Sequence, residues 1–306
     1  MQPVSNGKVH RRPIFKGSAD WVGQSGGPEP APQARDLHGL RVLVVEDDEI
    51  NQVVARHILE KLGLSVTVAG SGLEAVALAA EQSFDAVFMD IGLPGIDGYE
   101  AAARIRAHRR AGGRLPIIAM TGSTQRDPER MRRAGLNDFL VKPIDLDQLR
   151  AVLDQWLRPD APGLAEPAQE PLTPAQPLTP AQPVNLAQPT GRLDSGAALE
   201  RLAGNRALYL RLLKLVRVKH GGDAALIRAA LLAGDVPLAH LLAHTLKGVA
   251  GTIGAAWLQD AAQVMELASA RHAPNIDPLL VDGLETALAA ALRAVDLELA
   301  EMEPPA

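Results

Sequence analysis

At 306 residues the chain has room for about two domains, given roughly 100–200 residues per domain. Its composition, 47% hydrophobic and 22% charged, is that of a globular protein, and a net charge of -5 lacks the basic footprint of a dedicated nucleic-acid binder. The absence of cysteine excludes disulfides, thiolate metal sites and a cysteine nucleophile.

Residues 1–37 mix Gly, Pro, Ser and basic residues without periodicity, and we interpret them as a disordered tail or the remnant of a longer parent. Segment 38–158 then alternates β-branched runs with helical patterns. The runs are 41–45, 65–69, 86–89, 117–120 and 138–141, and the helical patterns are 50–62, 72–81, 98–108, 128–134 and 145–157. This (βα)5 alternation predicts an α/β doubly wound domain, a parallel sheet with helices on both faces.

Segment 159–190 is rich in Pro, Ala and Gln and repeats the hexapeptide Pro-Leu-Thr-Pro-Ala-Gln, which predicts a flexible linker. Segment 191–303 has helical patterns at 195–203, 206–220, 224–233, 237–252, 255–271 and 278–301. Gly, Asn or Pro residues separate them, so we expect an all-α helical bundle. Charged residues interrupt every apolar stretch before the ~18 residues that span a bilayer, which predicts a soluble, cytoplasmic protein.

Polar residues stand where the predicted strands end. Glu46 and Asp47 follow the first strand, Asp90 follows the third, Thr121 the fourth and Lys142 the fifth. Ligands of an open parallel sheet bind beyond these carboxyl ends. Converging carboxylates suit Mg²⁺, and one of them can act as a nucleophile. A hydroxyl and an ammonium group can stabilise charge on a transferring phosphoryl group.

Three stretches, residues 44–52, 89–98 and 141–143, resemble the signature blocks of the receiver domain of two-component response regulators. The resemblance covers residues 39–158 and implies a flavodoxin-like fold. It implies that Asp90 is the phosphoacceptor. It also implies an Mg²⁺ site formed by Glu46, Asp47, Asp90 and the carbonyl of Gly92.

By the same resemblance, Thr121 and Lys142 contact the phosphoryl oxygens, and Phe139 is the aromatic residue whose rotamer reports phosphorylation. Thr121 and Phe139 would therefore act as the switch residues. The sequence departs from the family pattern at Leu93, where Met is common, and at Gly122, where Ala is usual.

The stretch 237–252 contains the run Ala-His-Thr-Leu-Lys-Gly around His244. Helical spacing predicts a core stripe of Leu238, Leu242, Leu246, Val249 and Ile253. It predicts an opposite, solvent-exposed face of His240, His244, Lys247, Gly248 and Gly251. A neutral imidazole is a competent nucleophile, and Lys247 one turn later can offset phosphoryl charge.

This run resembles that of the histidine-containing phosphotransfer (HPt) domain, over residues 192–302. The resemblance implies that His244 is the phosphorylated histidine, with Lys247 beside it. The order of the two domains is similar to that at the C-terminal end of hybrid sensor histidine kinases. We interpret Asp48 as a loop or capping residue, Asp97 as turn and cap chemistry, and His240 as structural or incidental.

The sequence therefore predicts a phosphorelay protein rather than a conventional enzyme, although the receiver would catalyse its own phosphorylation and dephosphorylation. A sensor histidine kinase would supply the phosphoryl group to Asp90, and His244 would pass it to the receiver of a downstream response regulator. One alternative is a phosphorylation-dependent interaction switch or phosphate sink in which His244 is not obligatory. A phosphatase acting by back-transfer is another, and a DNA-binding regulator is disfavoured because the His244 face lacks base-reading side chains.

Overall fold

A computed structural model describes residues 37–108, 115–122, 127–157, 191–270 and 276–302, which belong to one compact unit. The predicted linker at 159–190 and the predicted tail, apart from its last residue, lie outside these ranges. Within the described ranges, no helix combines the length and apolar character needed to cross a membrane.

The first half of the described chain contains one fully parallel sheet in the order β2-β1-β3-β4-β5. The strands are β1 (Arg41–Val45), β2 (Ser65–Ala69), β3 (Ala86–Asp90), β4 (Ile117–Thr121) and β5 (Asp138–Val141). This topology confirms the predicted doubly wound fold. It also brings the carboxyl ends of β1 and β3 side by side, which is where ligands bind in such sheets.

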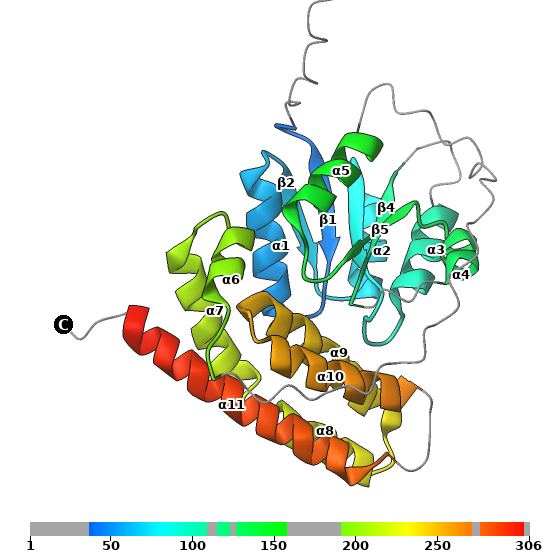
Figure 1. Cartoon of the computed structure of the whole chain (residues 1–306). Helices are drawn as coiled ribbons and strands as arrows, with labels where there is room; N and C mark the ends of the chain where they lie inside the picture. The colour runs from blue at the N-terminus through cyan, green and yellow to red at the C-terminus, as the bar shows by residue number, and fades with distance from the viewer. Residues whose placement is uncertain (1–36, 109–114, 123–126, 158–190, 271–275, 303–306) are drawn as a thin grey trace, which may run out of the picture. The chain divides into compact units, whose positions relative to one another are not determined.

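Helices cover both faces of the sheet (Figure 1). One face carries α1 (Glu49–Lys61) and α5 (Leu146–Trp156), and the other carries α2 (Gly72–Glu81), α3 (Gly98–His108) and α4 (Pro128–Ala134). Alternate residues of β1 supply the two cores: Val42 and Val44 face α1, whereas Leu43 and Val45 face α2 and α3. This explains why the strand reads as an unbroken apolar run.

Two acidic residues beside the sheet cap helices, as predicted. Asp48 is the N-cap of α1, and its Oδ1 accepts hydrogen bonds at 3.0 Å from the backbone N–H groups of Ile50 and Asn51. Asp97 accepts a 2.8 Å bond from the N–H of Glu100 in the first turn of α3. Both side chains satisfy backbone donors that a helix start leaves without an intrahelical partner.

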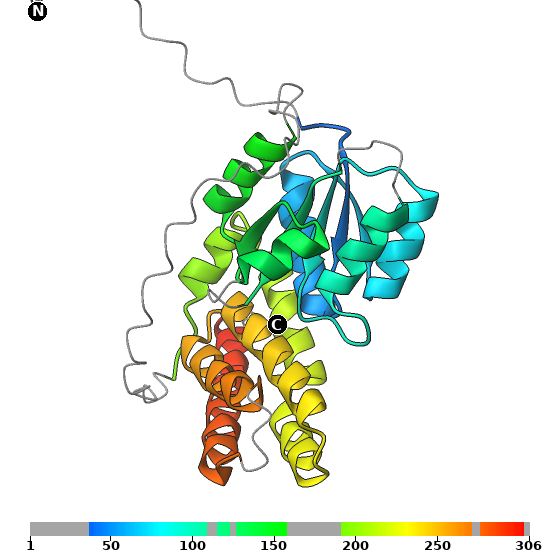
Figure 2. The same cartoon turned by 90° about the vertical axis from the view of Figure 1, so that its right-hand side faces the viewer.

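The second half of the described chain is entirely helical, which confirms the predicted all-α part. Its helices are α6 (Ser195–Arg201), α7 (Arg206–Lys219), α8 (Asp223–Leu232), α9 (Val236–Ile253), α10 (Ala256–Ala270) and α11 (Pro278–Met302). Helices α8, α9, α10 and α11 run alongside one another as a bundle (Figure 2). Asp235 caps the start of α9, and Gly254, with a φ of 82°, ends it in the left-handed conformation that favours glycine.

The residues predicted to form the core stripe of α9 are buried or partly buried over the last two-thirds of the helix. Leu246, Val249 and Ile253 are completely buried, and Leu242 is partly buried against the same core. Leu238 is 42% exposed, because it lies in the first turn of the helix at the end of the bundle. The helix is therefore anchored around the turns that carry His244 and Lys247.

Candidate functional site

Three carboxylates meet at the carboxyl ends of β1 and β3. Asp90 is the last residue of β3, and Glu46 and Asp47 follow β1 directly. The two strands are neighbours in the sheet, with Val45 opposite Met89, so their ends come together. One ligand oxygen from each carboxylate lies within 4.8 Å of the others, a spacing that can hold a metal ion. Oxygen ligands of this kind suit Mg²⁺.

Lys142, directly after β5, joins two of these acids. Its Nζ donates to Asp90 Oδ2 at 2.5 Å and to Glu46 Oε2 at 2.5 Å, and all three side chains are buried. Its backbone N–H donates at 2.7 Å to the carbonyl of Thr121, the last residue of β4. The strand pairing thus fixes the ammonium group over the Asp90 carboxylate, where it can contact a transferred oxygen.

The charges of this pocket shift the pKa values of its carboxyl groups. Burial raises the pKa of Glu46 to about 8, although Lys142 opposes the rise. Burial, with a contribution from Asp90, also raises the pKa of Asp47. Burial would raise the pKa of Asp90 as well, but Lys142 and His244 outweigh it and hold that pKa below its usual range. Asp90 is therefore the carboxylate of the three that ionises most readily, and the crowded acids favour a bound cation.

The remaining receiver residues of the predicted site lie around Asp90. The backbone N–H of Gly92 donates to Asp90 Oδ1 at 3.0 Å. Thr121 is partly buried at the end of β4, and Phe139 is partly buried in β5, where its side chain packs against the core under α2 and α3. These positions are compatible with the predicted switch pair, whose response to phosphorylation stays a prediction.

His244, from α9, faces Asp90. Its Nε2 lies 3.7 Å from Asp90 Oδ1, longer than a hydrogen bond but close enough for an ionic contact. A Cβ added to Gly92 would come within 2.4 Å of this Nε2, and one added to Gly122 within 2.5 Å of Lys247 Cε. The absence of a side chain at Gly92 is therefore what lets the His244 ring approach, whereas the nearest atoms to Gly122 belong to the flexible end of the Lys247 side chain, which can shift.

The prediction that the His244 face is solvent-exposed is wrong in this structure. Lys247 is 2% exposed, Gly248 and Gly251 are buried, and the His244 side chain is 12% exposed. Two neighbours cover this face: α10 along one side, and the segment around Asp90 and the start of α1 along the other. Periodicity placed these residues on one face of the helix, but the small residues on that face favour close packing rather than exposure.

Glu266, in α10, is a site residue that the sequence analysis missed. Its Oε1 lies 2.6 Å from His244 Nδ1, and its Oε2 accepts a hydrogen bond from Lys247 Nζ. Because an ionised carboxylate can only accept, Nδ1 carries the proton and Nε2 is the nitrogen that faces Asp90. No motif marks Glu266, since its place beside His244 depends on how α9 and α10 pair.

Glu266 and His244 also shift each other's pKa. Burial would lower the pKa of His244, but Asp90 and Glu266 together raise it to about 9. Burial would raise the pKa of Glu266, but His244 and Lys247 lower it to about 2. Nδ1 of His240, one turn earlier, lies 3.1 Å from the backbone carbonyl oxygen of Glu266, which supports the structural interpretation of this residue.

Comparison with known families identifies the two domains. The response regulator receiver domain family matches residues 42–154, and the Hpt domain family matches residues 211–295. The chain carries a receiver domain followed by an Hpt domain. The predicted domain types and their order are thereby confirmed. Asp90 lies in the receiver match and His244 in the Hpt match.

The relatives that match most of this chain are sensor proteins several times its length. The virulence sensor protein BvgS of Bordetella parapertussis is 34% identical over 272 residues, 85% of this chain and 20% of the relative. Sensor protein GacS of Pseudomonas syringae is 30% identical over 79% of this chain and 26% of its own length. The chain thus spans about a fifth to a quarter of these relatives.

A solved receiver domain of a Pseudomonas aeruginosa sensor histidine kinase, with a magnesium ion in its active-site cleft, is 42% identical. The match covers 39% of this chain and 98% of that one, with a TM-score of 0.36.

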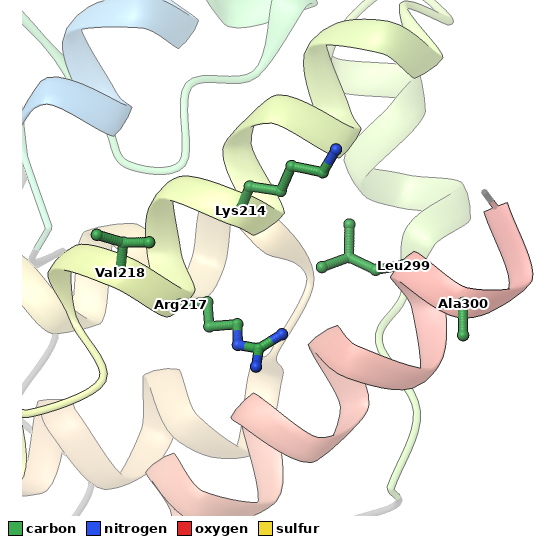
Figure 3. Close-up of a pocket in the computed structure, with 5 residues that line it drawn as sticks. All are labelled: Lys214, Arg217, Val218, Leu299 and Ala300. Carbon is green, nitrogen blue, oxygen red and sulfur yellow. The ribbon is translucent and has the colours of Figure 1, made fainter.

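A hollow in the Hpt helices lies away from both sites. It is lined by Lys214, Arg217 and Val218 of α7 and by Leu299 and Ala300 of α11 (Figure 3). Arg217 is ion-paired with Asp296 at 2.8 Å, so part of its positive charge is already neutralised. We assign no ligand to this hollow. A smaller cavity beside Lys142, lined also by Glu46, Asn51 and Thr252, belongs to the site described above.

Proposed function

We propose that the chain is a phosphorelay intermediate that receives a phosphoryl group on Asp90 and passes it through His244. The observation that carries the proposal is the placement of His244 Nε2 within 3.7 Å of Asp90 Oδ1. A carboxylate oxygen and an imidazole nitrogen at this distance are placed to exchange a phosphoryl group. We infer that a sensor histidine kinase is the donor and that a downstream receiver is the final acceptor.

In the first step, a carboxylate oxygen of Asp90 attacks phosphorus, an O–P bond forms, and the bond from phosphorus to the donor breaks. Glu46, Asp47 and Asp90, with the carbonyl of Gly92, would hold Mg²⁺. The ion would neutralise charge on the phosphoryl oxygens when bound. Lys142 already donates to Asp90 and can follow a transferred oxygen.

In the second step, the lone pair on His244 Nε2 attacks the same phosphorus. An N–P bond forms, the O–P bond breaks, and its electron pair returns to the Asp90 carboxylate. Glu266 accepts a hydrogen bond from Nδ1–H, which fixes the tautomer that leaves the lone pair on Nε2. A protonated His244 cannot attack, so the imidazole must lose its second proton before transfer.

The distance between the two reacting residues supports direct transfer. In-line transfer needs phosphorus bonded to one atom and at a near-attack distance of about 3–3.5 Å from the other. The 3.7 Å between Asp90 Oδ1 and His244 Nε2 is shorter than the length of the bond to phosphorus and the near-attack distance added together. The two residues must therefore move slightly apart when Asp90 is phosphorylated.

The test is labelling of the full chain with acetyl phosphate and Mg²⁺, followed by location of the phosphoryl group by mass spectrometry. We expect label on Asp90 and His244 in the unsubstituted chain, on Asp90 alone in His244→Gln, and on neither in Asp90→Asn. Label confined to Asp90 in the unsubstituted chain would support an interaction switch instead. Unchanged labelling of His244 in Asp90→Asn would refute transfer through Asp90.

A further inference from the structure

A second contact between the two domains involves charged residues that phosphoryl transfer does not use. His220 ends α7, and its side chain is buried between two carboxylates. Its Nδ1 lies 2.8 Å from Asp223 Oδ2 in the Hpt domain, and its Nε2 lies 3.1 Å from Asp48 Oδ2 in the receiver. Asp48 is the residue that caps α1, directly after the acidic pair of the metal site.

The Asp48 contact is ionic rather than a well-aligned hydrogen bond. Nε2 of His220 has no partner that meets hydrogen-bond geometry, although Asp48 Oδ2 is within bonding distance. A positive charge on the ring therefore accounts for the contact better than a neutral donor does. Burial would lower the pKa of His220, but Asp223 and Asp48 raise it to about 9.

An adjacent ion pair also has its positive residue on α7 and its negative residue on α1. Lys219 Nζ donates to the carboxylate of Glu49, the first residue of α1. Two consecutive cationic side chains at the end of α7 thus meet two consecutive acidic side chains at the start of α1. The Lys219–Glu49 pair is half-exposed and contributes little, whereas the His220 pair is buried and sensitive to the loss of either partner.

We propose that Lys219 and His220 form a recognition site for the acidic start of a receiver's first helix, with Asp223 orienting His220. This inference rests on the proposed function and specifies its partner. The Hpt domain would select receivers that carry a carboxylate at the helix cap after the metal-binding acids, as its own receiver does. A receiver with a neutral cap at this position would dock less tightly, because it would leave His220 with an unmatched charge.

Docking can be measured in the full chain without any phosphoryl group. The natural sequence has no cysteine, so Thr252→Cys introduces a single thiol. Thr252 is 7% exposed, and its hydroxyl lies 3.3 Å from Asn51 Oδ1 of α1. A maleimide reaches this thiol mainly when the domains separate, so the labelling rate reports the undocked fraction.

The variants form a double-mutant cycle in this background. Asp48→Asn keeps a capping side chain but removes its charge, and His220→Gln removes the charge of the other partner. We expect each single variant to raise the labelling rate about tenfold, as the loss of a charge-assisted contact implies. The double variant should label no faster than either single variant. Asp145→Asn, the same change at the exposed cap of α5, should leave the rate unchanged.

Three results would overturn the proposal: fast labelling of the Thr252→Cys chain itself, single variants within twofold of it, or effects that multiply in the double variant. Circular dichroism shows whether His220→Gln folds. If that variant does not fold, Asp48→Asn tests the same contact independently. The readout does not depend on His244 accepting a phosphoryl group. Failure of recognition and failure of the relay are therefore separable.

Discussion

Replacing Glu266 with glutamine should lower the free energy of unfolding of the Hpt helices by about 3 kcal/mol at pH 7. The carboxylate pKa falls from 4.5 to about 2 in the folded chain, and each pKa unit corresponds to about 1.4 kcal/mol. Lys247, which is 2% exposed, would also lose its carboxylate partner. Breaking a buried pair in this way costs about 3–5 kcal/mol, which agrees with the first figure.

The effect of Glu266→Gln should depend on pH. Because the folded pKa lies below the unfolded one, the carboxylate stabilises the fold fully above pH 4.5, and this contribution is lost as the pH falls towards 2. The difference between Glu266→Gln and the unsubstituted chain should therefore be large at pH 7 and much smaller at pH 2.5.

Urea unfolding followed by circular dichroism measures both values. Asp260→Asn provides the matched control, because Asp260 is an exposed acid on the same helix and its change should cost less than about 0.5 kcal/mol. If Glu266→Gln is no more destabilising than this control at pH 7, the Glu266 contacts do not anchor His244 and Lys247. A difference that stays constant down to pH 2.5 would contradict the electrostatic explanation.

Three further predictions concern the two sites. Asp47→Asn, or removal of Mg²⁺ with a chelator, should slow acetyl phosphate labelling of Asp90 by about a hundredfold, because a metal ion stabilises several kcal/mol of developing charge. Gly92→Ala keeps the backbone carbonyl and should leave that labelling intact, but it should slow transfer to the histidine by about tenfold or more, since its Cβ would lie 2.4 Å from His244 Nε2. Gly70→Ala, with no atom nearer than 3.7 Å, is the control. Replacing residues 171–183 with a Gly/Ser segment of equal length should leave transfer nearly intact, as shown by single-turnover kinetics, if the linker acts only as a tether.

The parts of the fold that the sequence predicted are those set by local pattern. Apolar runs such as 42–45 gave the strands, and the rule that parallel strands end at one edge brought Glu46, Asp47, Asp90 and Lys142 together. These four side chains do lie together, because sheet order alone determines which strand ends are neighbours. Their chemical roles remain predictions that the labelling experiments test.

The parts that the sequence did not predict depend on contacts between elements. Glu266 reaches His244 only because α9 and α10 pair in one register, and nothing in the α10 sequence marks that residue. The burial of Lys247 and the contact between His220 and Asp48 depend on how two domains meet. Gly122 was identified only as a departure from a family pattern, and its closeness to the end of the Lys247 side chain could not be read from the sequence.

The central claim is that phosphoryl leaves Asp90 for His244, and the decay of the Asp90 acyl phosphate in the full chain tests it most directly. The chain is phosphorylated with labelled acetyl phosphate, separated from the donor and sampled over time. Base-labile acyl phosphate is then distinguished from acid-labile phosphohistidine. We predict that acyl phosphate disappears as phosphohistidine appears at the same rate, and that His244→Gln markedly slows the loss. Equal decay in the two chains, with no phosphohistidine formed, would contradict the account.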